Sequence, residues 1–429
     1  MKKLFISDLK TINENITITI YGWIASMRSG KTKTFFDVVD STGKVQVIAD
    51  SDFGCKKEES VCVTGTVCVH NDDLEIKAVS ITTIGKVELQ LDPSPRCKFD
   101  VFSSDNADKV LSNRHLYLRN EKLIAAMKAR NAVTRAVREW FDSENYYEIT
   151  APILCPVILY DEETAIKTDF ENSDHNVFLT QCVGFYLESA VHALEKVYNI
   201  GPSFRAQETS SKRHLNEYWH VKSECAFCAY DEFFAVVENM LAFVTQKVEA
   251  CSDELCAILG TKFDNAALKT PFQRITYTDA LALLEKRGIS IPFGKSINAR
   301  GEKCLAEYFG APVWVTRNPA HIEGFPYRYC EDDKRLTMTA DLIWHNNHGE
   351  LLGIAEKITD PAELRARLAE KGKDKNADYE WFVDLRRVGT IPHCGMGMGL
   401  ERLIKCLFNL NHVRDAIPFP RSIGRKIYP

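Results

Sequence analysis

The sequence predicts an α+β protein in which a small β-barrel of the OB type precedes a larger domain built on an antiparallel sheet flanked by helices. Two observations lead to this fold class. Residues 1–88 contain five short β-type runs separated by polar turns, with no strong helical pattern, which is typical of a small closed barrel. In residues 113–429, strand and helix patterns are mixed without the strict alternation of a doubly wound sheet.

The five barrel strands are expected at 16–21, 34–40, 44–48, 61–67 and 74–79. An SH3-like barrel or a small sandwich is the alternative for this region. Residues 89–112 are predicted to be a linker, since Pro93 and Pro95 disfavour a helix there. The 429-residue length is itself too great for one ordinary core.

In the larger domain, apolar residues recur at helical spacing over 121–142. A helix over 361–371 is favoured by Asp360 as a cap, Pro361 in the first turn and Glu363 in a capping-box position. Further helices are expected at 186–196, 231–249, 277–287 and 398–409. Strands are expected at 146–150, 177–181, 198–205, 217–227, 337–344 and 350–358.

The composition is that of a folded globular protein, with 45% hydrophobic residues, 26% charged residues and a net charge of −5. This charge argues against indiscriminate nucleic-acid binding, although a local basic surface is compatible with it. No apolar run approaches the roughly 18 residues that a membrane span needs, so we expect no membrane association.

Fourteen cysteines accompany an N-terminus that lacks the pattern of a signal peptide, which predicts reduced thiols and a cytoplasmic protein. Cys225 and Cys228 form a lone CxxC with no second pair at zinc spacing. A metal or redox site there is a weak hypothesis beside the alternative of core cysteines on a strand.

An arginine followed by a basic loop is typical of a site for a nucleoside triphosphate. Phe204 and Arg205 end a predicted strand, and Arg213 and His214 lie in the loop that follows. A guanidinium binds phosphate through two parallel hydrogen bonds. From spacing alone the alternative of a surface hairpin is favoured, because charge runs usually mark solvated faces.

Three glycines at alternate positions, Gly395, Gly397 and Gly399, precede a predicted helix whose start carries Glu401 and Arg402. Glycines allow a backbone to approach a flat ligand closely. The pattern is neither the dinucleotide GxGxxG nor a Walker loop, because no Gly-Lys-Ser/Thr follows. Glycines that lead into an arginine at a helix start indicate a ligand site better than glycines alone.

Asp341 and Glu350 lie on two neighbouring predicted strands. Proteins bind Mg²⁺ through one or two carboxylates together with triphosphate oxygens. The pair is therefore a candidate metal site, and two solvated acids at strand ends are an equally good interpretation.

Together and in this order, these segments resemble the three signature motifs of the class II aminoacyl-tRNA synthetases. Residues 130–152, 201–227 and 393–421 are similar to motifs 1, 2 and 3. The IPFPR ending at 417–421 and the stretch 217–221 resemble the asparaginyl branch of the aspartyl, asparaginyl and lysyl subgroup. The barrel is similar to the OB-fold anticodon-binding domain of that subgroup. The larger domain thus resembles a class II synthetase catalytic domain.

The resemblance implies an asparagine–tRNA ligase, with ATP-dependent adenylation of an amino-acid carboxylate followed by transfer to tRNA. Three residues would be catalytic. Arg205 would hold the α-phosphate and stabilise charge in the transition state, Arg402 would reach the γ-phosphate, and Glu350, with Asp341, would bind Mg²⁺. The ATP site that the resemblance implies also contains Arg213, His214 and Gly399, and Phe204 or a neighbour of it would stack on adenine.

The resemblance also implies an amino-acid pocket, a tRNA site and a homodimer formed through motif 1. The pocket would contain Gly184, Tyr186, Lys222, Glu224 and Lys357. In the barrel, Phe35 would stack on an anticodon base, with Arg28 and Gln46 hydrogen-bonding nearby. A barrel-core aromatic is the alternative for Phe35.

Departures from the family cluster at positions that hold the ammonium and side chain of the amino acid. Lys222 and Gln207 each stand where the family has an acid, and Glu323 stands where it has a lysine. Like charges placed close together in a dry site are costly. Either Lys222 and Glu323 have exchanged charge and the pocket still binds asparagine, or a paralogue adenylates a different carboxylic acid. A non-catalytic tRNA-binding protein is a third interpretation, against which the retained triphosphate residues argue.

Overall fold

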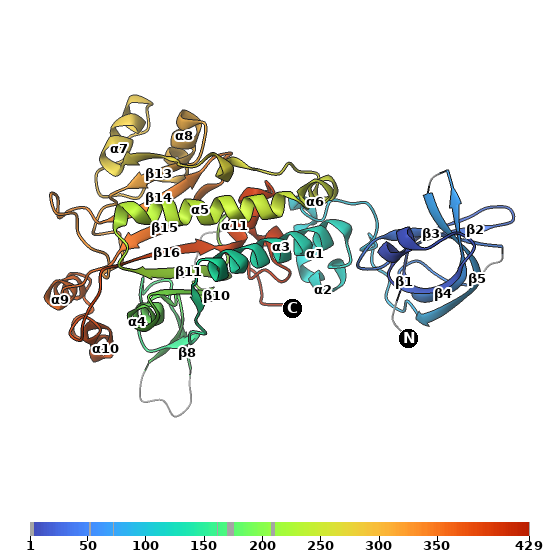
Figure 1. Ribbon diagram of the computed structural model, residues 1–429, viewed down its shortest axis with the longest axis horizontal. Coiled ribbons are helices and arrows are strands. Elements are labelled where there is room, and N and C mark those ends of the chain that lie inside the picture. The colour runs from blue at the N-terminus through green and yellow to red at the C-terminus, as the bar shows by residue number, and fades with distance from the viewer. Residues whose placement is uncertain are drawn as a thin grey trace. The chain divides into compact units, whose positions relative to one another are not determined.

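The computed structural model describes most of the chain, and its helices and strands are labelled in Figure 1. The described residues are 4–50, 53–71, 73–160, 162–169, 176–206 and 211–428. Gln207, one of the departures noted above, lies outside them. The chain divides into two compact units, Met1–Glu121 and Lys122–Pro429. The predicted domain limits, 1–88, 89–112 and 113–429, stay predictions.

The first unit contains a closed barrel with the strand order β1-β2-β3-β5-β4. The valines at 61, 63 and 67 in the fourth strand are fully buried, whereas most side chains between them are partly exposed. This alternation is the period of two that a strand shows when one face covers a core. The strands are β1 (Thr17–Ser29), β2 (Thr34–Val39), β3 (Lys44–Ala49), β4 (Ser60–His70) and β5 (Asp73–Gly85), preceded by the 3₁₀ helix η1 (Ile6–Thr11).

The predicted linker is only partly irregular. Residues 86–103 form turns and bends, as the prolines lead one to expect. Then follow the 3₁₀ helix η2 (Ser104–Asn106), α1 (Ala107–Ser112) and α2 (Arg114–Tyr117). Helix α1 lies within the segment predicted to be linker, and it buries Val110 and Leu111. Two apolar residues on a single turn are too short a pattern to predict a helix from periodicity.

The second unit is built on an eight-stranded sheet with the order β12-β13-β14-β15-β16-β11-β10-β6. The strands from β13 to β10 pair antiparallel, as predicted, and the two outer pairs, β12 with β13 and β10 with β6, are parallel. The strands are β6 (Tyr147–Glu148), β10 (Lys196–Phe204), β11 (Glu217–Ala226), β12 (Gln273–Thr276), β13 (Val313–Thr316), β14 (Thr339–Trp344), β15 (Gly349–Glu356) and β16 (His393–Gly399).

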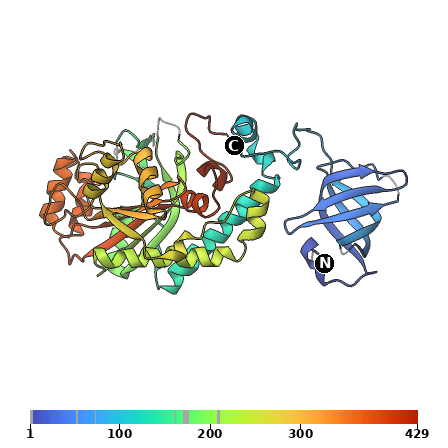
Figure 2. The same cartoon turned by 90° about the horizontal axis from the view of Figure 1, so that it is seen from above.

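Two long helices, α3 (Glu121–Ser143) and α5 (Tyr230–Glu249), lie along one face of this sheet (Figures 1 and 2). Phe141 of α3 stacks on Tyr198 of β10, with ring centroids 4.2 Å apart. Glu238 of α5 is buried, and it accepts a hydrogen bond of 2.8 Å from the indole of Trp314 in β13. A buried carboxyl with such a partner avoids the cost of an unsatisfied polar group.

Helix α9 (Pro361–Glu370) begins where the capping pattern predicts. The Asp360 carboxylate accepts a hydrogen bond of 2.7 Å from the backbone N–H of Glu363.

No helix in the described part of the chain is long and apolar enough to cross a membrane. The remaining elements are α4 (Gly184–Leu194), α6 (Ser252–Leu259), α7 (Tyr277–Lys286), α8 (Ala299–Phe309), α10 (Glu380–Asp384), α11 (Leu400–Leu407), η3 (Ala266–Lys269), η4 (Ala377–Tyr379), η5 (Val413–Ala416) and a small sheet of β7 (Leu154–Cys155), β8 (Ile166–Thr168) and β9 (Val177–Leu179).

Candidate active site

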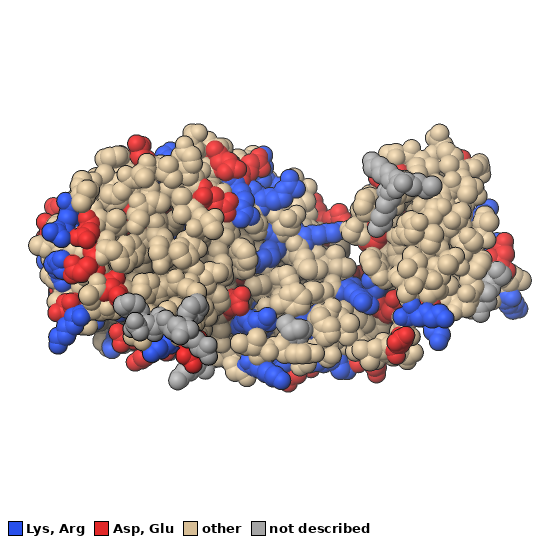
Figure 3. All heavy atoms as spheres, turned by 90° about the horizontal axis from the view of Figure 1, so that it is seen from below, with Lys and Arg blue, Asp and Glu red and all other residues tan. Residues whose placement is uncertain are grey.

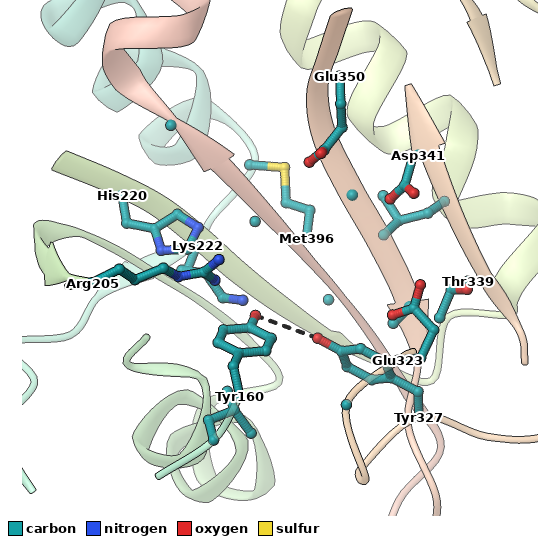
Figure 4. Close-up of a pocket in the computed structure, with 18 of the residues that line it drawn as sticks. Tyr160, Arg205, His220, Lys222, Glu323, Tyr327, Thr339, Asp341, Glu350 and Met396 are labelled. Carbon is teal, nitrogen blue, oxygen red and sulfur yellow. Dashed lines mark hydrogen bonds between the residues drawn. The ribbon is translucent and has the colours of Figure 1, made fainter. Parts of the chain in front are cut away.

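A cavity of about 680 Å³ lies over strands β11, β14, β15 and β16 of the second unit (Figure 4). Most side chains that the sequence singles out for nucleotide, metal and substrate converge on it. Those lining it are Arg205, Arg213, His214, Lys222, Asp341, Glu350, Lys357, Gly399 and Arg402. Among the described residues, the predicted Phe204, Gly184, Tyr186 and Glu224 are not part of its lining.

One end of the cavity holds cations that are already paired with acids. Arg402, in the first turn of α11, lies 3.1 Å from the carboxylate of Glu350 and donates a further hydrogen bond to its carbonyl. Arg213 forms an ion pair with Glu302 of α8. Gly349 has φ = 75°, and a Cβ there would lie 1.9 Å from Arg213, so glycine is needed at this position. Two of the arginines that the sequence predicts to bind phosphate are therefore held in place by the protein itself.

Arg205 differs from these arginines because no described acid pairs with its side chain. Its guanidinium lies 4.6 Å from the ring centroid of Tyr160, and its buried Nε has no hydrogen-bond partner. Its backbone N–H is bound to the carbonyl of Asn216 at 2.9 Å. The backbone fixes the residue while the guanidinium is available to an anionic ligand.

His214 lies beside these cations and is uncharged. Burial, together with the positive charges of Arg402 and Arg213, lowers its pKa to about 4. Its Nδ1 lies 2.6 Å from the hydroxyl of Ser211. A neutral imidazole contributes a hydrogen bond to a phosphate rather than a charge.

Three carboxyl groups, those of Glu323, Asp341 and Glu350, lie across the cavity from Arg205 (Figure 4). Burial raises the pKa of Asp341 well above its ordinary value, and the negative charges of Glu350 and Glu323 raise it further. Burial also raises the pKa of Glu323 to about 7. In Glu350 burial acts in the same direction, but Arg402 and its neighbours hold the pKa below the ordinary value. Asn318 donates a hydrogen bond of 2.8 Å to Asp341.

These acids do not form a complete protein cage for a metal. The described residues contain no group of three or more His, Cys, Asp or Glu side chains arranged to hold a metal ion. Asp341 and Glu350 lie on adjacent strands and line the same cavity. Two carboxylates suit a Mg²⁺ ion that takes its other ligands from a triphosphate and water.

Lys357 and Glu224, both predicted pocket residues, belong to a buried ion network. The Lys357 ammonium lies 2.8 Å from Glu224 and 3.1 Å from Glu188. Arg386 forms an ion pair with the other oxygen of Glu188, and the Nε2 of His393 lies 3.4 Å from that oxygen. The positive charges of Lys357 and Arg386 hold the pKa of Glu188 well below its ordinary value, despite burial. The network supports the pocket wall from behind.

The alternate glycines prove to lie in a strand, β16, and they provide room for side chains of the neighbouring strand β11. A Cβ at Gly395 would lie 2.3 Å from the carboxyl of Glu224, and one at Gly397 would lie 3.0 Å from the ammonium of Lys222. Residues paired across β11 and β16 include Glu224 with Gly395 and Lys222 with Gly397. The missing side chains therefore admit the charged side chains of the pocket.

Lys222 enters the cavity without an acidic partner. It is 5% exposed, and no carboxylate of the described chain lies within 4.0 Å of its ammonium. Burial lowers its pKa, but interactions with Cys182, Tyr160 and Glu224 outweigh burial and the net pKa is raised. Lys222 is therefore a charged and buried ammonium that faces the ligand space (Figure 4).

Two pocket tyrosines were not predicted from the sequence. The hydroxyls of Tyr160 and Tyr327 lie 3.5 Å apart and bridge the cavity between Lys222 and Glu323 (Figure 4). Tyr327 carries no motif signal, because it comes from a loop brought to the site by tertiary structure. Tyr160 lies outside the three motif-like stretches 130–152, 201–227 and 393–421.

The predicted residues outside the cavity have other roles. Tyr186 of α4 stacks on Trp381, with ring centroids 5.8 Å apart, and Gly184 contacts Cys182 at the start of that helix. Phe204 ends β10, whereas Tyr218, opposite the preceding residue in the register, lines the cavity. Tyr218 is thus the better placed aromatic for stacking on a base.

The barrel carries its own cluster of predicted residues. The Arg28 guanidinium donates a hydrogen bond of 2.9 Å to Gln46 and lies 5.5 Å from the ring centroid of Phe35. Phe36 points into the core with 1% exposure, whereas its neighbour Phe35 is partly exposed. Phe35 is therefore not a core aromatic, and the three side chains form a surface patch with a stacking platform.

Charge elsewhere on the surface is mixed. Figure 3 shows basic and acidic side chains interspersed over the face that it displays. This matches the net charge of −5. Recognition of a polyanion would therefore depend on local residues such as Arg28 rather than on the field of the whole protein.

Comparison with known families identifies both units. Residues 106–423 match the model of the class II tRNA synthetases (D, K and N). Residues 18–84 match the model of the OB-fold nucleic acid binding domain. The predicted OB-type barrel and class II catalytic domain are both confirmed.

Relatives and solved structures cover the full length of the chain. Asparagine–tRNA ligases from Thermococcus gammatolerans and Thermococcus kodakarensis are 32% and 33% identical to it, over all of this chain and 99% of each relative. The crystal structure of asparaginyl-tRNA synthetase from Pyrococcus horikoshii, complexed with asparaginyl-adenylate, superposes with a TM-score of 0.92 at 30% identity, and each chain is covered completely.

Proposed function

The chain belongs to the class II tRNA synthetases of the aspartate, lysine and asparagine group, and from this premise we propose that it is an ATP-dependent asparagine–tRNA ligase. The carboxylate of asparagine attacks the α-phosphorus of ATP and expels pyrophosphate. The terminal hydroxyl of tRNA then attacks the acyl carbon and releases AMP. The observation that carries the proposal is a single cavity lined by Arg205, which pairs with no described acid, and by the Arg402–Glu350 ion pair. The chain is also similar throughout to asparagine–tRNA ligases.

Arg205 would bind the α-phosphate and stabilise the charge that develops there during attack. Its buried Nε has no hydrogen-bond acceptor among the described residues, so it is available to a phosphate oxygen. Donors that are already in position stabilise a charged transition state without any rearrangement of the protein. Arg213, His214 and Arg402 would bind the outer phosphates. Tyr218 would stack on the adenine.

Asp341 and Glu350 would bind Mg²⁺ together with the phosphates. Burial, and then repulsion by Glu350 and Glu323, raises the pKa of Asp341, and a cation at this position would relieve the repulsion. The ion would neutralise charge on the outer phosphates. The protein would orient the Glu350 carboxylate toward the ion, because Arg402 holds this carboxylate at 3.1 Å.

The amino-acid end of the cavity would lie between Lys222 and Lys357, over β11 and β15. Lys357 lines the cavity and is fixed by Glu188 and Glu224, so its remaining donor would be available to the side-chain amide oxygen. Gly184 and Tyr186, in the first turn of α4, do not line the cavity. They would affect the amino-acid site indirectly, through the packing of α4. The cavity of about 680 Å³ accommodates both ATP and an amino acid.

The barrel would bind the tRNA anticodon. Phe35 would stack on a base, and Arg28 and Gln46, already hydrogen-bonded to each other, would contact its edge. Aromatic stacking contributes roughly 1–3 kcal/mol per base. Because tRNA is charged where proteins are made, the enzyme would work in the cytoplasm, where its 14 cysteines stay reduced.

The catalytic unit would form a homodimer through motif 1. Strand β6 (Tyr147–Glu148) is an edge strand of the large sheet. Tyr147 is 56% exposed, and Ile153 and Leu154 nearby are 40% and 43% exposed. Apolar side chains gathered at a sheet edge are typical of a subunit interface.

ATP–pyrophosphate exchange with each standard amino acid tests the proposal. We expect asparagine to support exchange and aspartate to support little. Exchange with aspartate alone would make the enzyme an aspartate ligase. Binding of ATP without exchange for any standard amino acid would favour the paralogue with another carboxylic acid.

A further inference from the structure

The cavity is electrically divided into two sides. Figure 4 shows Arg205 and Lys222 on one side and the carboxyls of Glu350, Asp341 and Glu323 on the other. The hydrogen-bonded tyrosines 160 and 327 lie between Lys222 and Glu323. A ligand that occupies this space meets positive charge at one end and negative charge at the other.

The two buried lysines of the cavity differ in how their charge is balanced. Lys357 is 4% exposed and has two carboxylates within 3.1 Å. Lys222 is 5% exposed and has no described carboxylate within 4.0 Å. A buried ammonium without a counter-charge is costly. The geometry therefore calls for a negative group of a ligand next to Lys222.

Glu323 is the complementary case. It is half-buried in the cavity wall, and no Lys or Arg nitrogen of the described chain lies within 4.0 Å of its carboxyl. Its nearest acids, Asp341 and Glu350, face the same space and repel it. Glu350 is already paired with Arg402, and Asp341 accepts a hydrogen bond from Asn318. Glu323 therefore has no paired cation among the described residues, and the positive charges of Lys371 and Arg367 only partly offset its burial.

We propose that Lys222 and Glu323 orient the substrate as a zwitterion, with its α-carboxylate beside Lys222 and Arg205 and its α-ammonium on Glu323. This inference deepens the proposed function, and it rests on that function only in assuming that an amino acid occupies this cavity. It assigns ammonium binding to a residue outside motif 2. It also gives Lys222 a positioning role, since Lys222 holds the carboxylate near the arginine that binds the α-phosphate.

The arrangement agrees with the chemistry of adenylation. The attacking oxygen must reach the α-phosphorus, and both cations on that side of the cavity favour the carboxylate there. The ammonium on the far side is kept away from Lys222, whose charge would repel it. A positive group beside Glu323 also removes the cost of ionising a carboxyl whose pKa burial raises to about 7.

Equilibrium binding to the full-length protein, measured by titration calorimetry, tests the proposal without requiring turnover. The probes are asparagine, succinamic acid, which lacks the α-amine, and 3-aminopropanamide, which lacks the carboxylate. The variants are Glu323→Gln and Lys222→Met. Asp341→Asn is the matched control, because it makes the same change of carboxyl to amide in the same wall. Thermal unfolding shows that each variant is folded.

We expect Glu323→Gln to weaken asparagine binding by at least about 30-fold and succinamic acid binding by less than about threefold. Lys222→Met should weaken asparagine and succinamic acid together and leave 3-aminopropanamide nearly unchanged. Asp341→Asn should alter the Mg²⁺ dependence of ATP binding but not the preference for asparagine over succinamic acid.

Three outcomes would overturn the proposal. In the first, wild-type protein fails to prefer asparagine to succinamic acid, or binds neither. In the second, Glu323→Gln weakens both ligands equally or leaves asparagine unaffected. In the third, Glu323→Gln shifts only the Mg²⁺ dependence, which would make Glu323 a metal ligand. The expected pattern of binding without pyrophosphate exchange would instead contradict the proposed ligase function and leave the zwitterion site standing.

Discussion

The two ends of the cavity differ in whether the protein neutralises its own charges. At the phosphate end, Arg402 is paired with Glu350 and Arg213 with Glu302. At the amino-acid end, Lys222 and Glu323 have no such partner among the described residues. Paired charges hold their geometry before a ligand arrives, whereas unpaired buried charges mark where a ligand must supply the counter-charge.

Arg205 should give the largest effect on activity, because it lies at the proposed phosphate end and pairs with no acid in the described part of the chain. We expect Arg205→Ala to lower kcat/KM for ATP–pyrophosphate exchange by at least about 100-fold, the cost of losing a preset donor to a charged transition state. Arg205→Lys should recover little, since lysine cannot form two parallel hydrogen bonds. Activity close to wild type in either variant would remove Arg205 from the reaction.

The two buried lysines should differ in how much they contribute to stability. Lys357→Met leaves Glu188 and Glu224 without this partner, so we expect it to lower the free energy of unfolding by about 3–5 kcal/mol. Lys222→Met removes a charge that has no described carboxylate within 4.0 Å, so it should cost much less stability than Lys357→Met. Urea unfolding of both variants, without ligands, makes the comparison. Equal losses of unfolding free energy in the two variants would show that the protein neutralises the charge of Lys222 as fully as that of Lys357.

Glu323 should make stability depend on pH. Its pKa is about 7 in the folded protein and has an ordinary value of 4.5. Between these values the folded state keeps a proton that the unfolded state has lost. Its contribution therefore falls as the pH rises from about 4.5 to about 7. We expect wild type to lose more stability between pH 5 and pH 8 than Glu323→Gln, as measured by urea unfolding.

A matched control for the pH experiment is Glu331→Gln, at a carboxyl whose side chain is 83% exposed. This variant should keep the wild-type pH dependence. The idea fails if Glu323→Gln and Glu331→Gln follow the same curve.

The smallest effect is expected in the barrel. Phe35→Ala removes a stacking platform of roughly 1–3 kcal/mol, so it should raise the KM for tRNA in aminoacylation about tenfold and leave pyrophosphate exchange unchanged. Phe36→Ala is unsuitable as a comparison because Phe36 is a core residue, with 1% exposure. A loss of exchange activity in Phe35→Ala would mean that the change acts on folding rather than on tRNA binding.

The sequence predicts those parts of the fold that depend on interactions between residues close together in the chain. The cap of α9 is an interaction among three neighbouring residues, and the alternation in β4 is set by one core. The sequence predicts linker at helix α1, because two buried residues on a single turn are too short a pattern to indicate a helix. The outer parallel strand pairs depend on long connections.

The site could be predicted only in part, because some of its residues are brought together only by contacts between distant segments of the chain. Arg205, Arg213 and Arg402 lie in recognisable motifs, and the structure brings them together. Glu224 was expected to face the substrate, but its position on β11 opposite Gly395 buries it against Lys357. Tyr327 lies in a loop with no local pattern, and only tertiary structure places it in the cavity.

Charging of total tRNA with radiolabelled asparagine or aspartate, each in competition with the other unlabelled amino acid, tests the central claim most directly. The account predicts that asparagine is attached in an ATP-dependent manner and that excess aspartate does not reduce its attachment. Attachment of aspartate in its place, or of neither amino acid by a folded enzyme that binds ATP, would contradict it.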